Sequence, residues 1–201
     1  MPEIILGRIA IIGCAGGGKS TLARRLAERL TLPLVHLDVL YWKPGWVEGD
    51  EAEFRARLSE ALASGRWITD GNFASEGDLH LANAELIVWV DQPRLLCLWR
   101  SIWRVIATGR RRRGDLPEGC PETFDPWLWD YIWHWNRRTR PKIEAALAEH
   151  APNTPLVRLR SDREIANWLT RQTPPETAGS VRSTPWSDGR SRPPPPHPDD
   201  R

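Results

Sequence analysis

The segment "GCAGGGKST", residues 13–21, constrains the fold of this chain more than any other feature of its sequence. Gly13, Gly18, Lys19 and Ser20 satisfy the phosphate-binding pattern G-x-x-x-x-G-K-[ST]. That pattern needs a buried strand before the loop and an amphipathic helix after it. The apolar run "RIAII" precedes the loop, and leucines at four-residue spacing follow it. The sequence therefore predicts a nucleoside triphosphate-binding loop between a strand and a helix.

Each residue type in this loop has a chemical reason to be there. Glycines let backbone amides turn inward around a β-phosphate, and the helix amino terminus adds positive potential. Lys19 is expected to bridge the β- and γ-phosphates, while the Ser20 hydroxyl ligates magnesium. The alternative is a flexible glycine turn, although a chance match to the whole pattern is rare at average residue frequencies. The predicted nucleotide-binding residues of the loop are Gly13, Gly16, Gly17, Gly18, Lys19, Ser20 and Thr21.

Short apolar runs alternate with helical patterns along the chain. The predicted strands are 8–12, 34–38, 67–70, 86–90 and 156–160, and the predicted helices are 19–30, 50–63, 93–108, 125–150 and 162–170. This alternation predicts the α/β, three-layer fold of P-loop NTPases, with a parallel five-stranded sheet covered by helices on both faces. Right-handed crossovers then place ligands at the carboxyl ends of the strands.

We expect one kinase-like domain over residues 1–171 and a disordered tail over residues 172–201. The tail is rich in proline, serine and charge, so it can bury too little apolar surface to offset its ordering entropy. Its run Pro193–Pro196 predicts a polyproline segment, which leaves open a proline-binding partner.

Composition limits the function classes. The formal net charge is +2, so any nucleic-acid contact must be local. The three cysteines fit no zinc or disulfide spacing and suggest reduced thiols in a cytoplasm. No apolar run approaches the length of a membrane helix, and we expect a soluble, cytoplasmic protein without a membrane partner.

Three aspartates end predicted strands, namely Asp38, Asp70 and Asp91. A magnesium-nucleotide site needs a carboxylate on a strand beside the P-loop strand. Asp70 is the best candidate, because the third strand usually neighbours the first; a turn or capping role is the alternative. Asp38 opens "DVLYWKPGW", where it could orient or deprotonate an acceptor hydroxyl, or cap a helix before a packed aromatic loop. Asp91 precedes Pro93 and is interpreted as a cap.

The stretch "TGRRRRGD", residues 108–115, places four arginines between glycines. In a chain with a P-loop, it fits a lid that brings an arginine to the transferring phosphoryl group. Nucleic-acid contact and a passive basic loop remain alternatives.

The segment "FDPWLWDYIWHWNRRTRPKI" contains four of the twelve tryptophans. Trp129 and Trp133 lie one helical turn apart, as do Tyr131 and Trp135, so two faces of the helix are aromatic. These faces predict either packing against the lid and core or a stacking platform for a base.

Six segments between Arg8 and Leu169 carry a resemblance to a known family: "GCAGGGKSTLARRLAERL", "LVHLDVLYWKPGW", "WITDGNF", "DQPRLLCLWR", "EGCPE" and "RPKI". In order and spacing they resemble the adenylate-kinase-like proteins called DNA topology modulation protein, the FlaR-like group. The wider nucleotide-kinase superfamily implies a nucleoside-binding insertion after the second strand and an arginine lid at about 109–124. The resemblance implies Arg100 against an adenine ring, a lid opening at Gly109–Arg110, and later lid arginines near Arg137, Arg138 and Arg140.

The sequence also departs from that pattern. Adenylate kinases place an arginine for the acceptor phosphate shortly after the third-strand aspartate, whereas here the next lysine or arginine is Arg94. This departure favours a neutral hydroxyl slightly over AMP as the acceptor. Cys120 alone lies in the lid region, which excludes a four-cysteine zinc site there.

The sequence thus predicts a P-loop kinase that uses ATP and magnesium to phosphorylate a small metabolite, and a nucleoside or nucleotide is the expected acceptor. The predicted catalytic residues are Lys19, Asp38, Arg110 and Arg137; the predicted metal residues are Ser20 and Asp70. The arginine run and the tryptophans leave a nucleic-acid-associated ATPase as an alternative, which the near-neutral charge opposes. A nucleotide-binding regulatory protein with little turnover is the other alternative.

Overall fold

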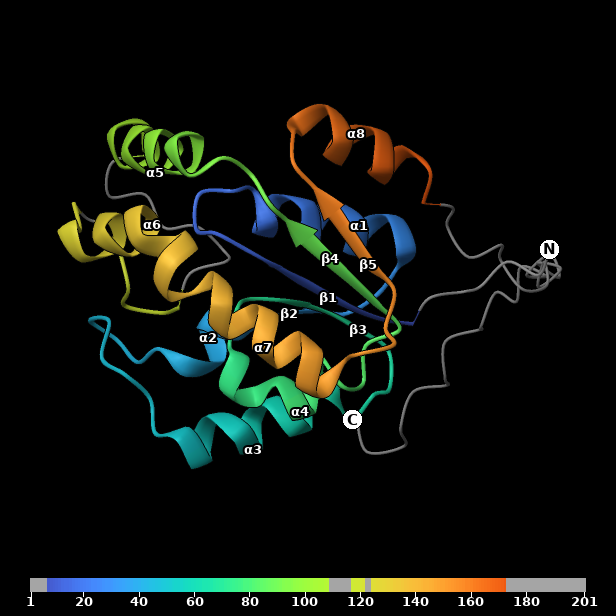
Figure 1. Cartoon of the computed structure of the whole chain (residues 1–201). Coiled ribbons are helices and arrows are strands. Elements are labelled where there is room, and N and C mark those ends of the chain that lie inside the picture. The colour runs from blue at the N-terminus through green and yellow to red at the C-terminus, as the bar shows by residue number, and fades with distance from the viewer. Residues whose placement is uncertain (1–6, 109–116, 122–123, 173–201) are drawn as a thin grey trace, which may run out of the picture.

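A computed structural model describes residues 7–108, 117–121 and 124–172, and in these the chain forms a sheet between two layers of helices (Figure 1). The predicted tail from 173 onward and most of the predicted lid, Arg110 included, lie outside the described residues. All pairings in the sheet are parallel, and the strand order is β2-β3-β1-β4-β5. The strands are β1 (Arg8–Gly13), β2 (Leu34–His36), β3 (Trp67–Asp70), β4 (Leu86–Val90) and β5 (Leu156–Leu159). The predicted sheet is confirmed.

The connections between the strands are helical. The helices are α1 (Lys19–Leu30), α2 (Leu37–Tyr41), α3 (Glu51–Leu62), the 3₁₀ turn η1 (Ala74–Glu76), α4 (Gly77–His80), α5 (Arg94–Thr108), α6 (Pro126–Arg138), α7 (Arg140–His150) and α8 (Asp162–Thr170). Side-chain caps begin three of them. Asp50, Asp125 and Ser161 accept hydrogen bonds from the first-turn amides of α3, α6 and α8. No helix among the described residues is long and apolar enough to span a membrane.

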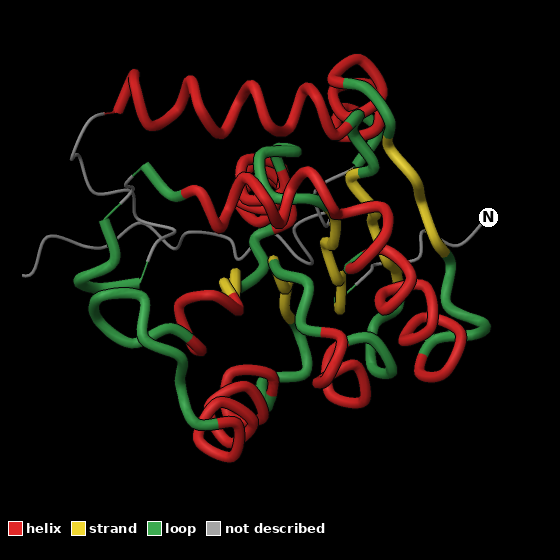
Figure 2. Tube along the Cα trace, turned by 60° about the vertical axis from the view of Figure 1, so that its left-hand side comes forward, coloured by secondary structure: helices red, strands yellow, loops and turns green. Residues whose placement is uncertain are grey.

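Two apolar clusters fill the spaces on either side of the sheet. Leucines of α1 pack with α8 against one face, whereas α4, α6 and α7 cover the other (Figures 1 and 2). The residues of β1 after Arg8 and all of β4 are buried, as expected for central parallel strands. The strand that carries the phosphate-binding loop is therefore held from both faces and from both edges.

The predicted helix 125–150 is wrong in one respect, because it is two helices. The chain breaks at Thr139, between α6 and α7, and Pro141 lies in the first turn of α7. A proline there loses no hydrogen bond, since first-turn amides have no partner within the helix. Within one continuous helix, Pro141 would remove a backbone hydrogen bond and clash with the carbonyl of Arg137. The break is a consequence of that proline.

The predicted strand 34–38 is also too long. β2 ends at His36, and Leu37 and Asp38 begin the short helix α2. Leu37 is fully buried against Gly71, where an added Cβ would lie 2.7 Å from the Leu37 Cβ. Because the leucine must turn into the core at this point, the strand cannot continue. Asp38 consequently projects from a helix that starts at the carboxyl edge of the sheet.

Candidate active site

The loop between β1 and α1 has neighbours so close that only glycine fits. Gly13 has φ +141°, and a Cβ there would lie 2.2 Å from the carbonyl oxygen of Val90. Gly16 has φ +77°, and its Cβ would lie 2.3 Å from the carbonyl oxygen of Cys97 in α5. The end of β4 and the first turn of α5 therefore pack directly against the backbone of the loop. These carbonyl oxygens exclude a side chain at Gly13 and Gly16, which is why the loop needs glycine there, while phosphate binding by the loop stays a prediction.

Lys19, the first residue of α1, lies against this loop. Its Nζ donates a hydrogen bond to the carbonyl oxygen of Cys14 at 3.1 Å, and the amide of Gly17 donates to the same oxygen at 3.1 Å. The Cys14 carbonyl thus holds both the turn of the loop and the ammonium group of Lys19 in place. Lys19, the loop glycines and Ser20 come together as predicted, while their roles toward phosphate and metal remain predictions.

Ser20 and Asp70 meet at the carboxyl edge of the sheet. Asp70 ends β3, which pairs directly with β1, so the expected neighbourhood of the two strands is confirmed. The carboxylate of Asp70 accepts hydrogen bonds from the Ser20 hydroxyl and from Nδ1 of His36, the latter at 2.9 Å. Burial alone would raise the pKa of Asp70, but the hydrogen bond from His36, the charge of Lys19 and the hydrogen bond from Ser20 hold it below its usual value.

This oxygen pair suits a magnesium ion. A hydroxyl and an ionised carboxylate next to a phosphate-binding loop are the ligands that magnesium takes in such sites. His36 also belongs to the cluster, although sequence reasoning overlooked it. The signal was its position at the end of β2, beside the end of β3 in a parallel sheet.

Asp38 lies across from Lys19 in the same charge cluster. Its side chain is exposed to solvent, yet the surrounding protein raises the pKa of Asp38 to about 6, chiefly by limiting hydration of the carboxylate. The charges of Lys19 and His36 lower this pKa and that of Asp70 raises it, while the Trp42 side chain donates a hydrogen bond to Asp38. The carboxylate therefore reaches solvent while being oriented by an indole.

Aromatic residues follow Asp38 in α2 and in the next turn, and others from the β3–α4 connection and α6 pack near them. We call them the aromatic wall; its members are Tyr41, Trp42, Trp46, Phe73 and Tyr131. Tyr41 contacts Trp42 edge-on with ring centroids 5.1 Å apart, and Trp42 contacts Trp46 at 5.8 Å. Phe73 packs on Tyr41 at 5.0 Å, and Tyr131 of α6 faces Asp38 from another element. The rings of this segment pack on one another, as the alternative interpretation of the segment expects, and the acceptor role of Asp38 stays a prediction.

Asn72 is a site residue that sequence reasoning did not identify. Its Oδ1 accepts a hydrogen bond from the Gly13 amide at 2.8 Å, and its Nδ2 donates to the Gly13 carbonyl at 2.7 Å. Because the amide of Gly71 already donates to Ile11, the Asn72 side chain continues the β1–β3 pairing by one step. Tyr131 hydrogen-bonds to the side chains of Asn72 and Thr139. Asn72 thus ties the phosphate loop to β3 and to α6.

A second overlooked feature joins the turn of residues 43–47, which follows α2, to residues 117–121. The thiol of Cys120 donates to the carbonyl of Lys43 at 3.2 Å and accepts from the amide of Trp46 at 3.4 Å. The amide of Gly45 donates to Gly119, and the Trp46 indole donates to Pro121 at 3.1 Å. We call this set of contacts the turn clamp. It connects the aromatic wall to the segment after the arginine run.

The predicted arginines have mixed placements. Arg100 of α5 forms an ion pair with Asp162 at the start of α8, and its contact with an adenine ring remains a prediction. Arg137 is exposed near the end of α6. Arg138 pairs with Asp130 at 2.8 Å, and Arg140 binds Asp91 through two hydrogen bonds of 3.1 and 3.2 Å.

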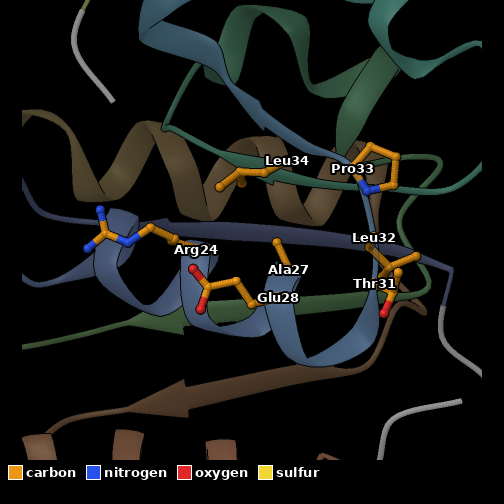
Figure 3. Close-up of a pocket in the computed structure, with 7 residues that line it drawn as sticks. All are labelled: Arg24, Ala27, Glu28, Thr31, Leu32, Pro33 and Leu34. Atoms are coloured by element: carbon orange, nitrogen blue, oxygen red, sulfur yellow. The ribbon is translucent and has the colours of Figure 1, made fainter. Parts of the chain in front are cut away.

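A separate hollow of about 570 Å³ lies along α1 and its connection to β2 (Figure 3). It is mainly apolar, with Arg24 and Glu28 at one side; its other lining residues are Ala27, Thr31, Leu32, Pro33 and Leu34. Its lining starts past the amino end of α1, which carries Lys19 and Ser20. It is therefore separate from the charge cluster. Among the described residues, no group of three or more histidine, cysteine or acidic side chains is placed to bind a metal by itself.

Comparisons with known proteins place these features in context. No protein-family model matches the sequence. A shikimate kinase of Corynebacterium glutamicum is 27% identical over 182 residues, which cover 84% of this chain and 88% of that enzyme. A solved shikimate kinase from Acinetobacter baumannii, in complex with shikimate, has a TM-score of 0.49 and 16% identity, covering 82% of this chain and 89% of that one. A deoxyadenosine kinase from M. mycoides with bound dCTP has a TM-score of 0.45 and 13% identity, covering 81% and 97%.

The shikimate kinase of Corynebacterium glutamicum, which matches over most of both chains, is consistent with the geometry of the site. The phosphate loop lies at the carboxyl edge of a parallel sheet, with the β3 carboxylate beside it. Together, the loop, the strand order and the relative mark the chain as a P-loop kinase, an enzyme that transfers a phosphoryl group from ATP to a small molecule.

Proposed function

We propose that this chain transfers the γ-phosphoryl group of ATP to a hydroxyl group of a nucleoside or nucleotide. The observation that carries the proposal is the cluster of Lys19, Asp70 and Asp38 around the phosphate loop, with aromatic rings beside Asp38. In this proposal Lys19 and Asp70 bind ATP and its magnesium ion. Asp38 and the aromatic wall bind the acceptor.

Asp38 is the proposed general base. Its carboxylate accepts the proton of the acceptor hydroxyl as that oxygen bonds to the γ-phosphorus and the bond from this phosphorus to the β–γ bridging oxygen breaks. ADP leaves with the electron pair of the broken bond. A base whose pKa is about 6 is largely deprotonated at neutral pH and still basic enough to accept that proton. The hydrogen bond from Trp42 holds the carboxylate in place.

The donor side fits magnesium-ATP. Backbone amides of the glycine loop and the amino end of α1 favour phosphate, and Lys19 would neutralise charge on the transferring group. Ser20 and Asp70 would hold magnesium, directly or through water, which adds charge neutralisation at the phosphates. Arg137 and the predicted lid arginine Arg110 are assigned to the same developing charge, where an arginine accelerates transfer by about 10³ to 10⁵.

The experiment is a transfer assay with ATP and a panel of nucleosides, nucleoside monophosphates and sugar acids, with products identified by mass. A phosphorylated nucleoside or nucleotide that disappears in Lys19→Ala supports the proposal and names the acceptor, whereas a phosphorylated sugar acid alone contradicts the proposed acceptor class. Thr31→Ala, an exposed residue just beyond α1, is a matched control that retains activity. If ATP binds and no panel member is consumed, the proposal fails. A salt-sensitive gel shift would then favour the nucleic-acid-associated ATPase.

A further inference from the structure

We propose that the acceptor is uncharged: a nucleoside or similar ring-bearing alcohol, and not a nucleoside monophosphate or a carboxylic acid. This inference rests on the proposed function and specifies its substrate class. It follows from the charges that face Asp38, from the partners of every cation between Asp38 and Arg94, and from the rings of the aromatic wall.

The groups nearest the acceptor hydroxyl are acidic. Asp38 and Asp70 lie close enough for the charge of each to act on the other. The neighbouring basic groups are Lys19 and His36, and Nδ1 of His36 already donates to Asp70 at 2.9 Å. Because Lys19 lies on the phosphate loop, its charge is assigned to ATP. An anionic acceptor would therefore approach two carboxylates and the γ-phosphate. Such an acceptor needs a dedicated cation, as phosphate- and carboxylate-binding sites generally provide.

The sequence from Asp38 to residue 93 contains four lysines and arginines, namely Lys43, Arg55, Arg57 and Arg66. Arg66 immediately precedes β3, at the amino end of the strand and so at the opposite edge of the sheet from Asp70. It cannot serve an acceptor at Asp38. Of the other three, Lys43 lies in the turn of residues 43–47, and Arg55 and Arg57 lie on α3. Each of them forms an ion pair with a carboxylate.

Glu53 holds two of these three cations. Lys43 Nζ lies 2.9 Å from one oxygen of Glu53, and the guanidinium of Arg57 lies 2.6 Å from the other. Both carboxylate oxygens are thus used. An anion that bound Lys43 would compete with Glu53 for the charge of the same ammonium group, and Arg57 holds Glu53 in place along the same helix.

Arg55 is held more firmly. It donates to Glu76, whose carboxylate is 1% exposed, at 2.7 Å, and also pairs with Asp78 through both guanidinium nitrogens. Removing Arg55 from a buried carboxylate would leave an uncompensated buried charge, which is strongly unfavourable. Arg55 therefore serves the η1–α4 segment, not an acceptor.

His80 adds no positive charge. It is buried, donates from Nε2 to the carbonyl of Phe73 at 2.9 Å, and has a pKa lowered by burial. Over residues 38–93, all of which the structure describes, the acceptor side thus presents a carboxylate and aromatic rings, and Lys43, Arg55 and Arg57 are already paired with carboxylates. Flat rings such as Trp42 and Trp46 bind a neutral base or sugar face without any charge on the ligand.

The test compares matched acceptors in one reaction. A nucleoside and its 5′-monophosphate, and a sugar alcohol and the corresponding sugar acid, compete at equal concentration, and the products are read by mass. The inference predicts at least a hundredfold higher kcat/KM for the uncharged member of whichever pair reacts. A preference for the 5′-monophosphate over its nucleoside would overturn the inference while the proposed function still stood, whereas a preference for the sugar acid would overturn both. If neither member of either pair reacts although ATP binds, the proposed function itself fails.

A charge variant tests the cause of the selectivity. Glu53→Gln removes the carboxylate shared by Lys43 and Arg57, so kcat/KM for the charged member should rise about tenfold relative to the uncharged one. Glu60→Gln, an exposed glutamate two turns further along α3, should leave the ratio as in the wild type. An equal ratio in all three proteins would contradict the assignment of selectivity to paired cations.

Discussion

At the level of single residues, environment separates two aspartates of the same cluster into two roles. Asp70 is 5% exposed and accepts hydrogen bonds from His36 and Ser20, so its ionised form is favoured. Asp38 reaches solvent and accepts a hydrogen bond from Trp42, and its pKa rises to about 6, chiefly because hydration of the carboxylate is limited. A low pKa suits a carboxylate that stays ionised beside a metal. A pKa near neutrality suits a base that exchanges a proton in each turnover.

The first prediction concerns pH. Asp38 accepts a proton only when ionised, so kcat/KM should increase about tenfold per pH unit below pH 6 and level off above it. Lys19, His36 and Asp70 face the same carboxylate, so the apparent midpoint reports their combined charge. A pH profile of wild type and Asp38→Asn measures this. Asp38→Asn should lose most of its activity, and its kcat/KM should no longer rise with pH below pH 6. If the rise is unchanged in the variant, the titrating group is not Asp38.

The second prediction concerns Asn72. Asn72→Ala would leave both the amide and the carbonyl of Gly13 without their partner, which should weaken ATP binding about tenfold. The acceptor KM should change little, because Asn72 acts through the phosphate loop. Calorimetric titration with ATP, together with kcat and KM for both substrates, separates these effects. Asn136→Ala, at an exposed position of α6, is the control.

Two results would argue against this role for Asn72. One is an unchanged ATP affinity; the other is an equal loss at both substrates. Asn72→Asp is informative as well, because it retains the acceptor for the Gly13 amide but places a carboxylate against the Gly13 carbonyl. Its ATP affinity should be at least as low as that of Asn72→Ala.

The contrast between Asp70 and Asn72 shows what the sequence could and could not predict about the site. Asp70 ends a strand beside the P-loop strand, so topology alone brings it to Ser20. Asn72 matters because its side chain replaces a backbone step of the sheet after Gly71, and such a substitution leaves no pattern in a single sequence. His36 was missed because its role depends on the register between β2 and β3.

At the level of elements, the turn clamp joins two segments that are far apart in the chain. The turn of residues 43–47 carries part of the aromatic wall, and residues 117–121 follow the arginine run. Gly119 has φ +71°, and a Cβ there would lie 2.8 Å from Pro44. The two segments therefore pack closely as well as hydrogen-bond. The clamp holds the turn that carries Trp46, whose ring contacts Trp42.

The third prediction follows from the clamp. Cys120→Ala removes an acceptor for the Trp46 amide and a donor to the Lys43 carbonyl, so the acceptor KM should rise about three- to tenfold. ATP affinity should stay within about twofold. Cys120→Ser can make both hydrogen bonds and should retain most of the wild-type KM. If Cys120→Ser and Cys120→Ala behave alike, or if ATP affinity falls with the acceptor affinity, the clamp does not position the acceptor side.

Prediction of the elements succeeded where pattern and topology agree. The boundaries of α1, α5 and β3 lie within one residue of those expected, because a loop motif, a strongly periodic stretch and a buried run define them. The single helix expected over 125–150 failed at Pro141, whose cue was present in the sequence but was outweighed by continuous periodicity. The short helix α2 was missed because burial of Leu37 against Gly71 is a tertiary contact.

At the level of the whole molecule, the sheet holds donor and acceptor groups on one edge. β1 carries the phosphate loop, β3 carries Asp70 and β2 leads into Asp38, so three strands supply one cluster. Helices α5 and α6 lie side by side beyond that edge (Figures 1 and 2). Ligand binding at this edge should therefore stabilise the native state of the whole sheet against unfolding.

The fourth prediction is thermal. Magnesium-ATP at about 100 times its Kd should stabilise the native state by about 2.7 kcal/mol and raise Tm by about 5–10 °C. Lys19→Ala should fold but lose most of that increase, because the ammonium group faces the phosphate loop. Scanning calorimetry with and without ligand measures both. An equal ligand-induced increase in the variant would place ATP away from Lys19.

The most direct test of Asp38 as the general base separates nucleotide binding from phosphoryl transfer. Single-turnover transfer from γ-labelled ATP to the identified acceptor is measured in wild type and in Asp38→Asn, alongside the ATP Kd of each. If Asp38 is the base, the ATP Kd of Asp38→Asn should lie within about twofold of the wild-type value, since only the base is removed. Transfer in the variant should be at least about a hundredfold slower. Transfer at the wild-type rate in Asp38→Asn would contradict the assignment of Asp38 as the base of this kinase.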